Sequence, residues 1–454
     1  MEPGRPALHD TDVLVENGRI ARIGTALEVP ESTLEIDASG GILIPGMIDT
    51  HRHMWQTGLR GYGADWTLTN YFYFYYINHP NAFRPEDIYA GNLLGALEAL
   101  DAGVTTSVDW SHGLRSTAHA DAAVDALERV GGRSVLAYGN HMQGAWEWGT
   151  TPEFRDFIAR RIDGKGDMLT LQLAFDISND PAFPEKAAFD VARELDVRVN
   201  THAGVWGGSD DAGLRRMADH GVLSDKVIYV HTGSLNDDSY QRIAATGGHV
   251  SVATESENSA GQGYSPTARL RRHGISTSLS TDSSVLVSGD MLHAMRATLS
   301  ADRAKSHLDA HANGETVADN ELRSSDVLDY ATRGGAEAIG LSDKIGTITE
   351  GKRADLVLIK NDKNPAMFPI INPAGHIVQS AGVGDVHTVL VDGRVVKQNG
   401  VLLLNAELAE ARRVIEESVA HVRSTMDEAA WNAGLNPSQP DIERIANPYR
   451  YTGG

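Results

Sequence analysis

The 454-residue sequence contains no cysteine. Disulfide bonds, thiolate metal ligands and a cysteine nucleophile are therefore excluded, and any metal must be held by histidine, aspartate or glutamate. Positive charge is also scarce, with 40 lysine and arginine residues against 61 aspartate and glutamate residues and a formal net charge of −21. Because phosphates would be repelled, this balance argues against nucleic acid and anionic membranes as partners. Small neutral or cationic molecules remain as ligands.

Long apolar runs are missing as well. No segment reaches the roughly 18–20 apolar residues that span a bilayer. The first residues, MEPGRPALHDTDVLVENGRIARIG, lack the basic-then-apolar order of a signal peptide. These features predict a cytoplasmic protein that does not contact membranes.

The two ends of the chain share a pattern of short strands and tight turns. The segment TDVLVENGRIARIG alternates apolar and polar residues around an Asn-Gly pair, which is a hairpin signal. Far along the chain, ADLVLIKND and VHTVLVDGRVVKQNG repeat this pattern. We expect residues 1–46 and 345–405 to form one discontinuous β domain.

Between these ends, strand-like segments alternate with stretches whose apolar residues recur at helical spacing. The helix-like stretch RPEDIYAGNLLGALEALDAG is one example, and eight β-like segments can be counted in all. Eight strand–helix units predict an α/β fold of the (β/α)8, or TIM-like, barrel type over residues 47–344. Residues 406–454 are predicted to form a C-terminal amphipathic helix and tail.

Polar residues follow several of these predicted strands. His51 and His53 are two apart in a strand-like segment, so their side chains should point to one face. His202, His231 and Asp282 stand at the ends of three other segments. A barrel gathers all these ends at one mouth, where active sites lie. The pattern predicts a metal centre, because a single strand-end histidine is usually structural but five such residues in register are not.

These motifs resemble those of the amidohydrolase superfamily. The resemblance rests on PGMIDTHRH, NTHAG, YVHTG, STDSS and IGTITEGKRADLVLI, and extends from about residue 12 to residue 405. Within the superfamily the chain is most similar to the cytosine, guanine and S-adenosylhomocysteine deaminases and the triazine hydrolases. The resemblance implies a β-sandwich, built from both chain ends, beside the barrel.

The resemblance also implies roles for the strand-end residues. His51, His53, His202 and Asp282 would ligate one divalent metal ion, zinc or iron, and His231 would lie beside the metal-bound water and help to place substrate. Dinuclear relatives use a lysine on the fourth strand, and TLQLAFDIS has none, so one ion is expected. Such an ion makes hydroxide available near neutral pH, and Asp282 could take the proton of that water.

One position departs from the pattern of the deaminases. They carry a glutamate three residues after the fifth-strand histidine, where this chain has Val205. Glu255 and Glu257 follow the seventh strand, and strand alternation would aim both to the same side, so either could replace the missing acid. Alternatively, they cap the following turn or helix, or the substrate has a better leaving group.

Further candidates for substrate contact follow the first three strands: Trp55, Gln56, Trp110, His112 and His141. Gln56 could hydrogen-bond the edge of a heterocycle. The aromatic run NYFYFYY, residues 70–76, could form part of a lid that stacks on a planar ligand, or a helix or subunit contact.

Together these features predict a metal-dependent hydrolase that cleaves a carbon–nitrogen bond of a small planar nitrogen-containing molecule. A deaminase of a heterocycle is the first form of this hypothesis. An amide, urea or carbamate hydrolase and a hydrolytic dehalogenase are alternatives, and a non-catalytic assembly protein is a fourth. A homodimer or higher homo-oligomer is expected, because the tail helix and the aromatic run offer surfaces to bury.

Overall fold

The computed structural model describes residues 7–205 and 208–437. At its centre is a parallel eight-stranded sheet in the order β11-β10-β9-β8-β7-β6-β5-β4. A backbone bridge between Arg52 and Asp282 joins the last strand to the first, so the predicted barrel is confirmed. The strands are β4 (Met47–Arg52), β5 (Val104–Ser111), β6 (Arg133–Tyr138), β7 (Leu169–Ala174), β8 (Arg198–Ala203), β9 (Val227–His231), β10 (His249–Val252) and β11 (Ser276–Leu279).

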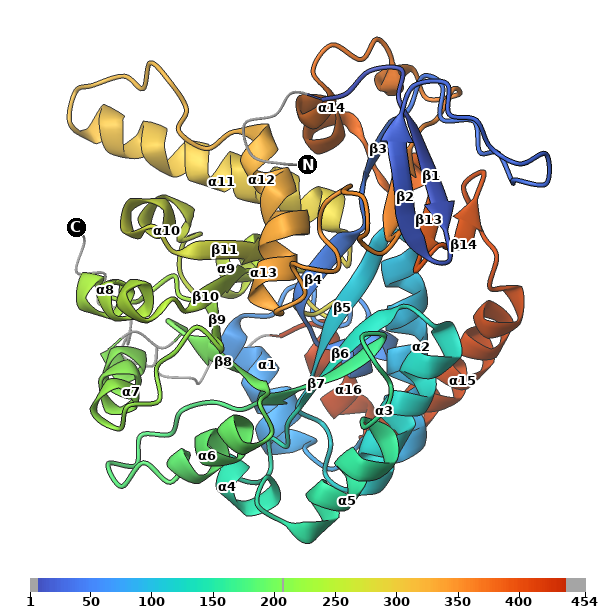
Figure 1. Cartoon of the computed structure of the whole chain (residues 1–454). Helices are drawn as coiled ribbons and strands as arrows, with labels where there is room; N and C mark the ends of the chain where they lie inside the picture. Colours follow the sequence, from blue (N-terminus) through green and yellow to red (C-terminus); the bar gives the residue numbers. More distant parts are fainter. Residues whose placement is uncertain (1–6, 206–207, 438–454) are drawn as a thin grey trace.

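Helices cover the outside of the barrel (Figure 1). The longest of the early ones, α2 (Pro85–Asp101), begins with a proline, which needs no hydrogen-bond acceptor there, and Asp87 accepts the backbone N–H of Arg84 at 2.7 Å. It ends before Gly103, whose φ of +83° favours glycine. The other barrel helices include α3 (Thr117–Val130), α4 (Ala145–Trp148), α5 (Pro152–Arg161), α6 (Lys186–Glu194), α7 (Gly208–Asp219), α8 (Asp237–Thr246), α9 (Thr254–Ala260), α10 (Thr267–His273), α11 (Met291–Ala312), α12 (Ser324–Asp329) and α13 (Gly335–Ala338).

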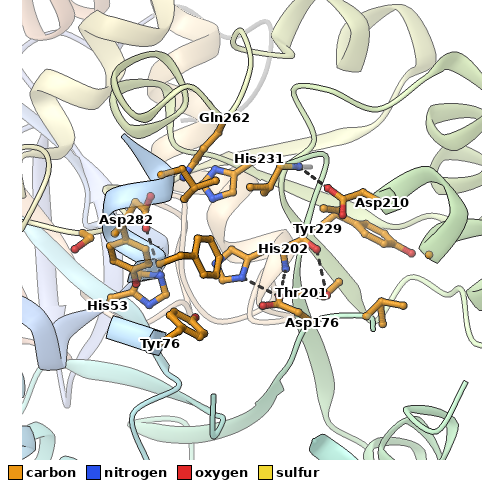
Figure 2. Close-up of a pocket in the computed structure, with 18 of the residues that line it drawn as sticks. His53, Tyr76, Asp176, Thr201, His202, Asp210, Tyr229, His231, Gln262 and Asp282 are labelled. Carbon is orange, nitrogen blue, oxygen red and sulfur yellow. Dashed lines mark hydrogen bonds and ion pairs between the residues drawn. The ribbon is translucent and has the colours of Figure 1, made fainter. Parts of the chain in front are cut away.

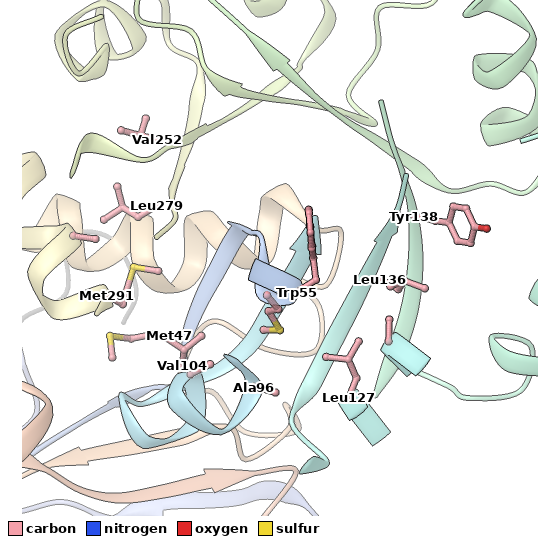
Figure 3. Packing of buried hydrophobic residues seen from close by; sticks show 14 of the residues in the cluster. Met47, Trp55, Ala96, Val104, Leu127, Leu136, Tyr138, Val252, Leu279 and Met291 are labelled. Carbon is pink, nitrogen blue, oxygen red and sulfur yellow. The ribbon is translucent and has the colours of Figure 1, made fainter. Parts of the chain in front are cut away.

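The hydrophobic core fills the space between the strands and these helices (Figure 3). Met47 and Val104 lie on neighbouring strands, and Leu136 and Leu279 lie further round the barrel; all four are at most 1% exposed. Close packing of this kind makes a single Leu→Ala change cost about 2–5 kcal/mol. The core therefore fixes the strand ends that carry the polar residues.

Both ends of the chain contribute to smaller antiparallel sheets, as predicted. A hairpin of β1 (Asp12–Glu16) and β2 (Arg19–Gly24) turns at Asn17 and Gly18, both with positive φ. A five-stranded sheet pairs β3 (Ile42–Pro45) with strands from near the other end, β12 (Leu356–Ile359), β13 (Val386–Val391), β14 (Arg394–Gln398) and β15 (Val401–Leu402). This pairing supports our proposal that 1–46 and 345–405 form one domain.

A buried ion-pair network connects the barrel to these sheets. Arg133, at the start of β6, is fully buried and donates to the Asp355 carboxylate at 2.9 and 3.2 Å and to Asp167 at 3.1 Å. Asp355 directly precedes β12. The two parts of the chain are thus held together by charge-assisted hydrogen bonds as well as by apolar packing.

The C-terminal segment forms α15 (Asn405–Ser424) and α16 (Glu428–Leu435), and residues 438–454 of the predicted tail lie outside the described residues. Helix α15 packs against α2 of its own chain (Figure 1), where Tyr89 donates to Glu410 at 2.6 Å. One face of the tail helix is therefore covered within the chain. No helix in the described part of the chain is long and apolar enough to cross a membrane.

Candidate metal centre and cavity

Three histidines converge at the mouth of the barrel. Ring nitrogens of His51, His53 and His202 all lie within 4.8 Å of one another. The Nε2 atoms of His51 and His202 are 3.3 Å apart, and Asp282 Oδ1 lies 3.4 Å from Nε2 of both His51 and His53. This set of nitrogen and oxygen donors fits a divalent metal ion, because neutral imidazole and carboxylate are its usual protein ligands in the absence of thiolate.

Hydrogen bonds on the far side of the rings fix their orientation. His53 Nδ1 donates to the Trp110 carbonyl at 2.9 Å, and His202 Nδ1 donates to Asp176 Oδ1 at 2.9 Å. With the proton on Nδ1, the Nε2 lone pair of each ring faces the cluster. The rings are thus held in the tautomer that a metal requires.

The protonation states of the cluster suit metal binding. Burial lowers the pKa of His51 well below its usual value and that of His53 to about 4, which favours the neutral imidazoles. Burial opposes the charge of Asp282, but the hydrogen bond from His51 and the neighbouring histidines keep its pKa well below its usual range. These three groups are ready to bind a cation without losing a proton first. His202 differs, because burial opposes its charge but Asp176 outweighs burial and raises the pKa of His202 above its usual value.

The backbone is strained where these side chains emerge. His231, Thr232 and Asp282 have φ values of 76°, 63° and 57°, a region that non-glycine residues rarely adopt and that costs of order 1–3 kcal/mol each. Asp282 is held there by two backbone bonds to the first strand: its N–H donates to the His51 carbonyl at 3.0 Å, and its carbonyl accepts from the His53 N–H at 2.9 Å. Part of the backbone strain of the described chain is therefore located at the candidate centre.

A cavity of about 200 Å³ lies against the cluster (Figure 2). It is smaller than the ~300–1,000 Å³ of sites for drug-sized ligands, so it suits a small molecule. Tyr71, Phe72 and Tyr76 from the aromatic run form part of its wall. The run belongs to α1 (Leu68–Phe72) and the helical turn that follows it, Tyr73–Asn78.

Apart from the histidines, the charged residues in the described lining of the cavity are all acidic. They are Asp176, Asp210 and Asp282. A cavity with this charge repels anions and accommodates neutral or cationic ligands.

Of the residues predicted to act, His53, His202, His231 and Asp282 line this cavity. Glu257 lies behind His231: its carboxylate is fully buried, Oε1 is 3.5 Å from His231 Nδ1, and it also accepts the Ala253 N–H at 2.8 Å. Burial raises the pKa of Glu257. Glu255 lies outside the lining and accepts a hydrogen bond from the Ser288 hydroxyl at 2.7 Å.

The expectation that strand alternation aims both glutamates to one side is wrong. Strand β10 ends at Val252, and α9 begins at Thr254, so the two residues project at helical spacing. Glu257 turns inward to His231, while Glu255 turns towards Ser288.

The other predicted contacts lie behind the cavity wall. Gln56 is buried; it donates to the Tyr71 hydroxyl at 2.7 Å and accepts from Ser283 at 2.7 Å, and both partners line the cavity. The remaining four are packed among neighbouring rings or hydrogen-bonded to the backbone and are absent from the described lining: Trp55, Trp110, His112 and His141.

Asp176, Asp210, Tyr229 and Gln262 line the cavity but were not singled out from the sequence. A search for polar residues at strand ends could have found Asp176, because it lies two residues after the end of β7. Asp210 lies on helix α7, so a search for polar residues at strand ends does not find it.

Histidines and an aspartate that converge at the mouth of a barrel are the arrangement expected of a metal-dependent hydrolase. Residues 42–396 match the model of the amidohydrolase family. Because the match covers most of the chain, the protein belongs to the amidohydrolase family, and it is a hydrolase that acts on carbon–nitrogen bonds.

Individual relatives agree with this assignment. The chain is 29% identical over 431 residues to a 5-methylthioadenosine/S-adenosylhomocysteine deaminase of Desulforudis audaxviator, covering 89% of this chain and 95% of the relative. It is 29% identical to a 5'-deoxyadenosine deaminase of Methanothermobacter thermautotrophicus, covering 89% and 92%.

Two solved structures share the fold. They are an atrazine chlorohydrolase from Arthrobacter aurescens TC1 complexed with zinc (TM-score 0.77, 22% identity, 91% and 96% covered) and an adenosine deaminase from Xanthomonas campestris with bound zinc (TM-score 0.74, 21% identity, 91% and 94% covered).

Proposed function

We propose that the protein is an aminohydrolase with one zinc ion, which releases ammonia from a small heterocyclic amine. The observation that carries the proposal is the convergence of His51, His53, His202 and Asp282 beside a small cavity with an aromatic wall. The deaminase relatives support it. Iron remains the alternative ion, because three histidines and one aspartate suit both metals.

The wall of the cavity favours a planar, non-anionic substrate. Tyr71, Phe72 and Tyr76 offer ring faces and edges for stacking. Gln56 fixes the Tyr71 hydroxyl from behind, which is the role we assign to this glutamine in place of direct contact with the heterocycle.

The chain's own residues account for the proton transfers. His51, His53, His202 and Asp282 would hold the ion, which, when bound, lowers the pKa of water so that hydroxide is available near neutral pH. Asp282 accepts one proton of the attacking water. The water oxygen bonds to the ring carbon, and the proton that Asp282 has taken moves to the adjacent ring nitrogen. The second proton of the water, left on the new hydroxyl, moves to the amine nitrogen, which departs with the C–N electron pair as ammonia. The product keeps a carbonyl and a ring N–H. His231, backed by Glu257, holds the oxygen during this exchange.

A second candidate is a hydrolase of an amide, urea, carbamate or halide. It is favoured by Val205, which lines the cavity where the resembling deaminases carry a glutamate. A leaving group that needs less protonation tolerates this loss.

Metal analysis joined to an ammonia-release screen tests the proposal. We expect about one zinc per chain and ammonia from at least one purine, pyrimidine, pterin or triazine amine, and no activity in His202→Ala. One zinc with no ammonia, but with hydrolysis of an amide or a halide, would favour the second candidate. A protein that binds no metal would overturn both.

A cytoplasmic location and a homo-oligomeric state complete the proposal. Part of the surfaces expected to mediate assembly is used within the chain, since α15 packs on α2 and the aromatic run lines the cavity. Leu408 and Leu435 of the tail helices and Tyr73 of the aromatic run stay exposed and offer apolar surface to a second copy. Light scattering of the purified protein tests the oligomeric state.

A further inference from the structure

The aromatic run 70–76 has two faces. Three of its rings line the cavity: Tyr71, Phe72 and Tyr76. Phe74 and Tyr75 are absent from the described lining and are at most 6% exposed. Their ring centroids lie 5.1 and 6.4 Å from that of Trp66, which precedes α1. The aromatic wall of the cavity is therefore supported from behind by Trp66.

Trp66 is in turn bound to the C-terminal helix α16. Its ring is 4% exposed, and its Nε1 donates to the Gly434 carbonyl at 2.7 Å. The Tyr62 hydroxyl donates to the Trp431 carbonyl at 2.8 Å, and the ring centroids of these two residues are 4.5 Å apart. Figure 1 shows α16, in red, close to α1, in blue. Helix α16 thus contacts the segment that leads into the aromatic run.

Gly434 allows the close approach of α16 to this segment. A Cβ at this position would lie 1.9 Å from the Tyr62 hydroxyl oxygen. Tyr62 is 6% exposed, and its ring packs against Phe74 with centroids 5.4 Å apart, so the hydroxyl cannot move aside without disturbing the aromatic run. Any side chain at position 434 would therefore displace the end of α16 and its hydrogen bond with Trp66.

The backbone on either side of Tyr62 is bonded to the loop after β11. Two residues of this loop line the cavity: Ser283 and Leu286. Gly61 and Gly63 each donate their backbone N–H at 3.1 Å to carbonyls of the same loop. The contacts of α16 with Tyr62 and Trp66 therefore act on two parts of the cavity wall.

We propose that Tyr62, Trp66 and Gly434 are positioning residues, through which α16 holds the aromatic wall of the cavity in place for the substrate. None of the three belongs to the described lining. A loosened wall weakens stacking on the substrate in the ground state and the transition state alike, so KM should rise while kcat stays the same. This effect on KM rests on the proposed function, because it assumes that a planar substrate stacks on the wall.

Hydrogen exchange of the zinc-loaded full chain, followed by mass spectrometry, tests the contact without any substrate. We expect the backbone amides of residues 68–78 to exchange at least about fivefold faster in Trp66→Phe, which loses the N–H donor, and in Gly434→Ala. Exchange in β7 and the zinc content should not change. Asn432→Ala, an exposed change on α16, is the matched control and should leave exchange at the wild-type rate.

Steady-state kinetics with an amine that releases ammonia test the consequence for the substrate. Trp66→Phe and Gly434→Ala should each raise KM about three- to tenfold and leave kcat unchanged. Where Gly434→Ala folds poorly, Trp66→Phe decides alone. A lower kcat at unchanged KM would overturn the inference.

Two results of the exchange experiment would also overturn it: wild-type exchange of residues 68–78 in Trp66→Phe, or the same acceleration in Asn432→Ala. The proposed function can fail separately. Faster exchange confined to residues 68–78, with no ammonia released from any amine by the wild-type protein, would overturn the proposed function and leave the support of the wall by α16 standing.

Discussion

Nδ1 of His231 lies 3.5 Å from Oε1 of Glu257, and both side chains are at most 1% exposed. The carboxylate is fixed by the Ala253 N–H at the start of α9. The contact is longer than a hydrogen bond, but a carboxylate this close to Nδ1 favours the tautomer with the proton on that nitrogen, which leaves the other nitrogen to act in the cavity. Glu257 is therefore a positioning residue for His231.

Replacing Glu257 by glutamine should lower kcat about a hundredfold and change KM little, because His231 loses its fixed tautomer while the cavity keeps its shape. Zinc content by mass spectrometry should not change. Glu255→Gln serves as the comparison, since Glu255 contacts Ser288 instead, and its effect should be far smaller. Equal losses in the two variants would contradict the role of Glu257.

Removal of the Asp176 charge should weaken metal binding. Asp176 Oδ1 accepts hydrogen bonds from both Nδ1 and the backbone N–H of His202. We expect Asp176→Asn to raise the zinc dissociation constant about 10- to 100-fold, because such partners orient a ligand and raise its basicity. Competition with a chelating dye measures this constant directly. Asp180→Asn, an exposed change in the same loop, should leave it unchanged.

Loss of the Arg133 network should destabilise the fold. Arg133→Met leaves the buried Asp355 carboxylate without its arginine, while Asp167 keeps Arg353 and Lys344. We expect the free energy of unfolding in urea to fall by about 3–5 kcal/mol. The exposed Arg160, which pairs with Asp121 and Asp156, gives the control. Arg160→Met should cost at most about 1 kcal/mol. Equal losses of unfolding free energy in the two variants would show that the buried network stabilises the fold no more than an exposed ion pair does.

Asp109 should make stability depend on pH. Burial raises the pKa of this carboxyl to about 7, against about 4 in the unfolded chain, so the folded protein binds the proton more tightly. Its contribution to stability is present below pH 4 and is lost as the pH rises to about 7. The difference in unfolding free energy between wild type and Asp109→Asn should fall with pH by up to about 1.4 kcal/mol per unit over this range. A difference that stays constant between pH 4 and 7 would contradict the raised pKa of Asp109.

The sequence was sufficient to predict the barrel, because the barrel depends on local periodicity, and polar residues at strand ends indicated which side chains gather at its mouth. The roles of His51, His53, His202 and Asp282 as metal ligands came from the family resemblance and stay a prediction. The sequence was insufficient where the direction of a side chain depends on the residue at which a strand ends or a helix begins. Glu255 and Glu257 were placed by strand alternation, whereas the chain is already helical from Thr254. Tyr229 was missed because a tyrosine inside an apolar strand looks like any core residue. Its buried hydroxyl, without a partner in the described part of the chain, is visible only once α7 is in place.

The barrel closes at the place where the candidate metal centre forms. Thr281 donates to the Asp49 carboxylate across a sequence separation of 232 residues, beside the backbone bonds between Asp282 and the first strand. In the folded chain the ligands are brought together only by the contact between the first and last strands of the barrel. An ion cannot template early folding here, since bringing such distant segments together has a large entropic cost that must be met first. Only molecules with a fully folded barrel should therefore bind the metal ion. A chain truncated before β11 should neither fold nor bind the metal ion with the affinity of the full chain.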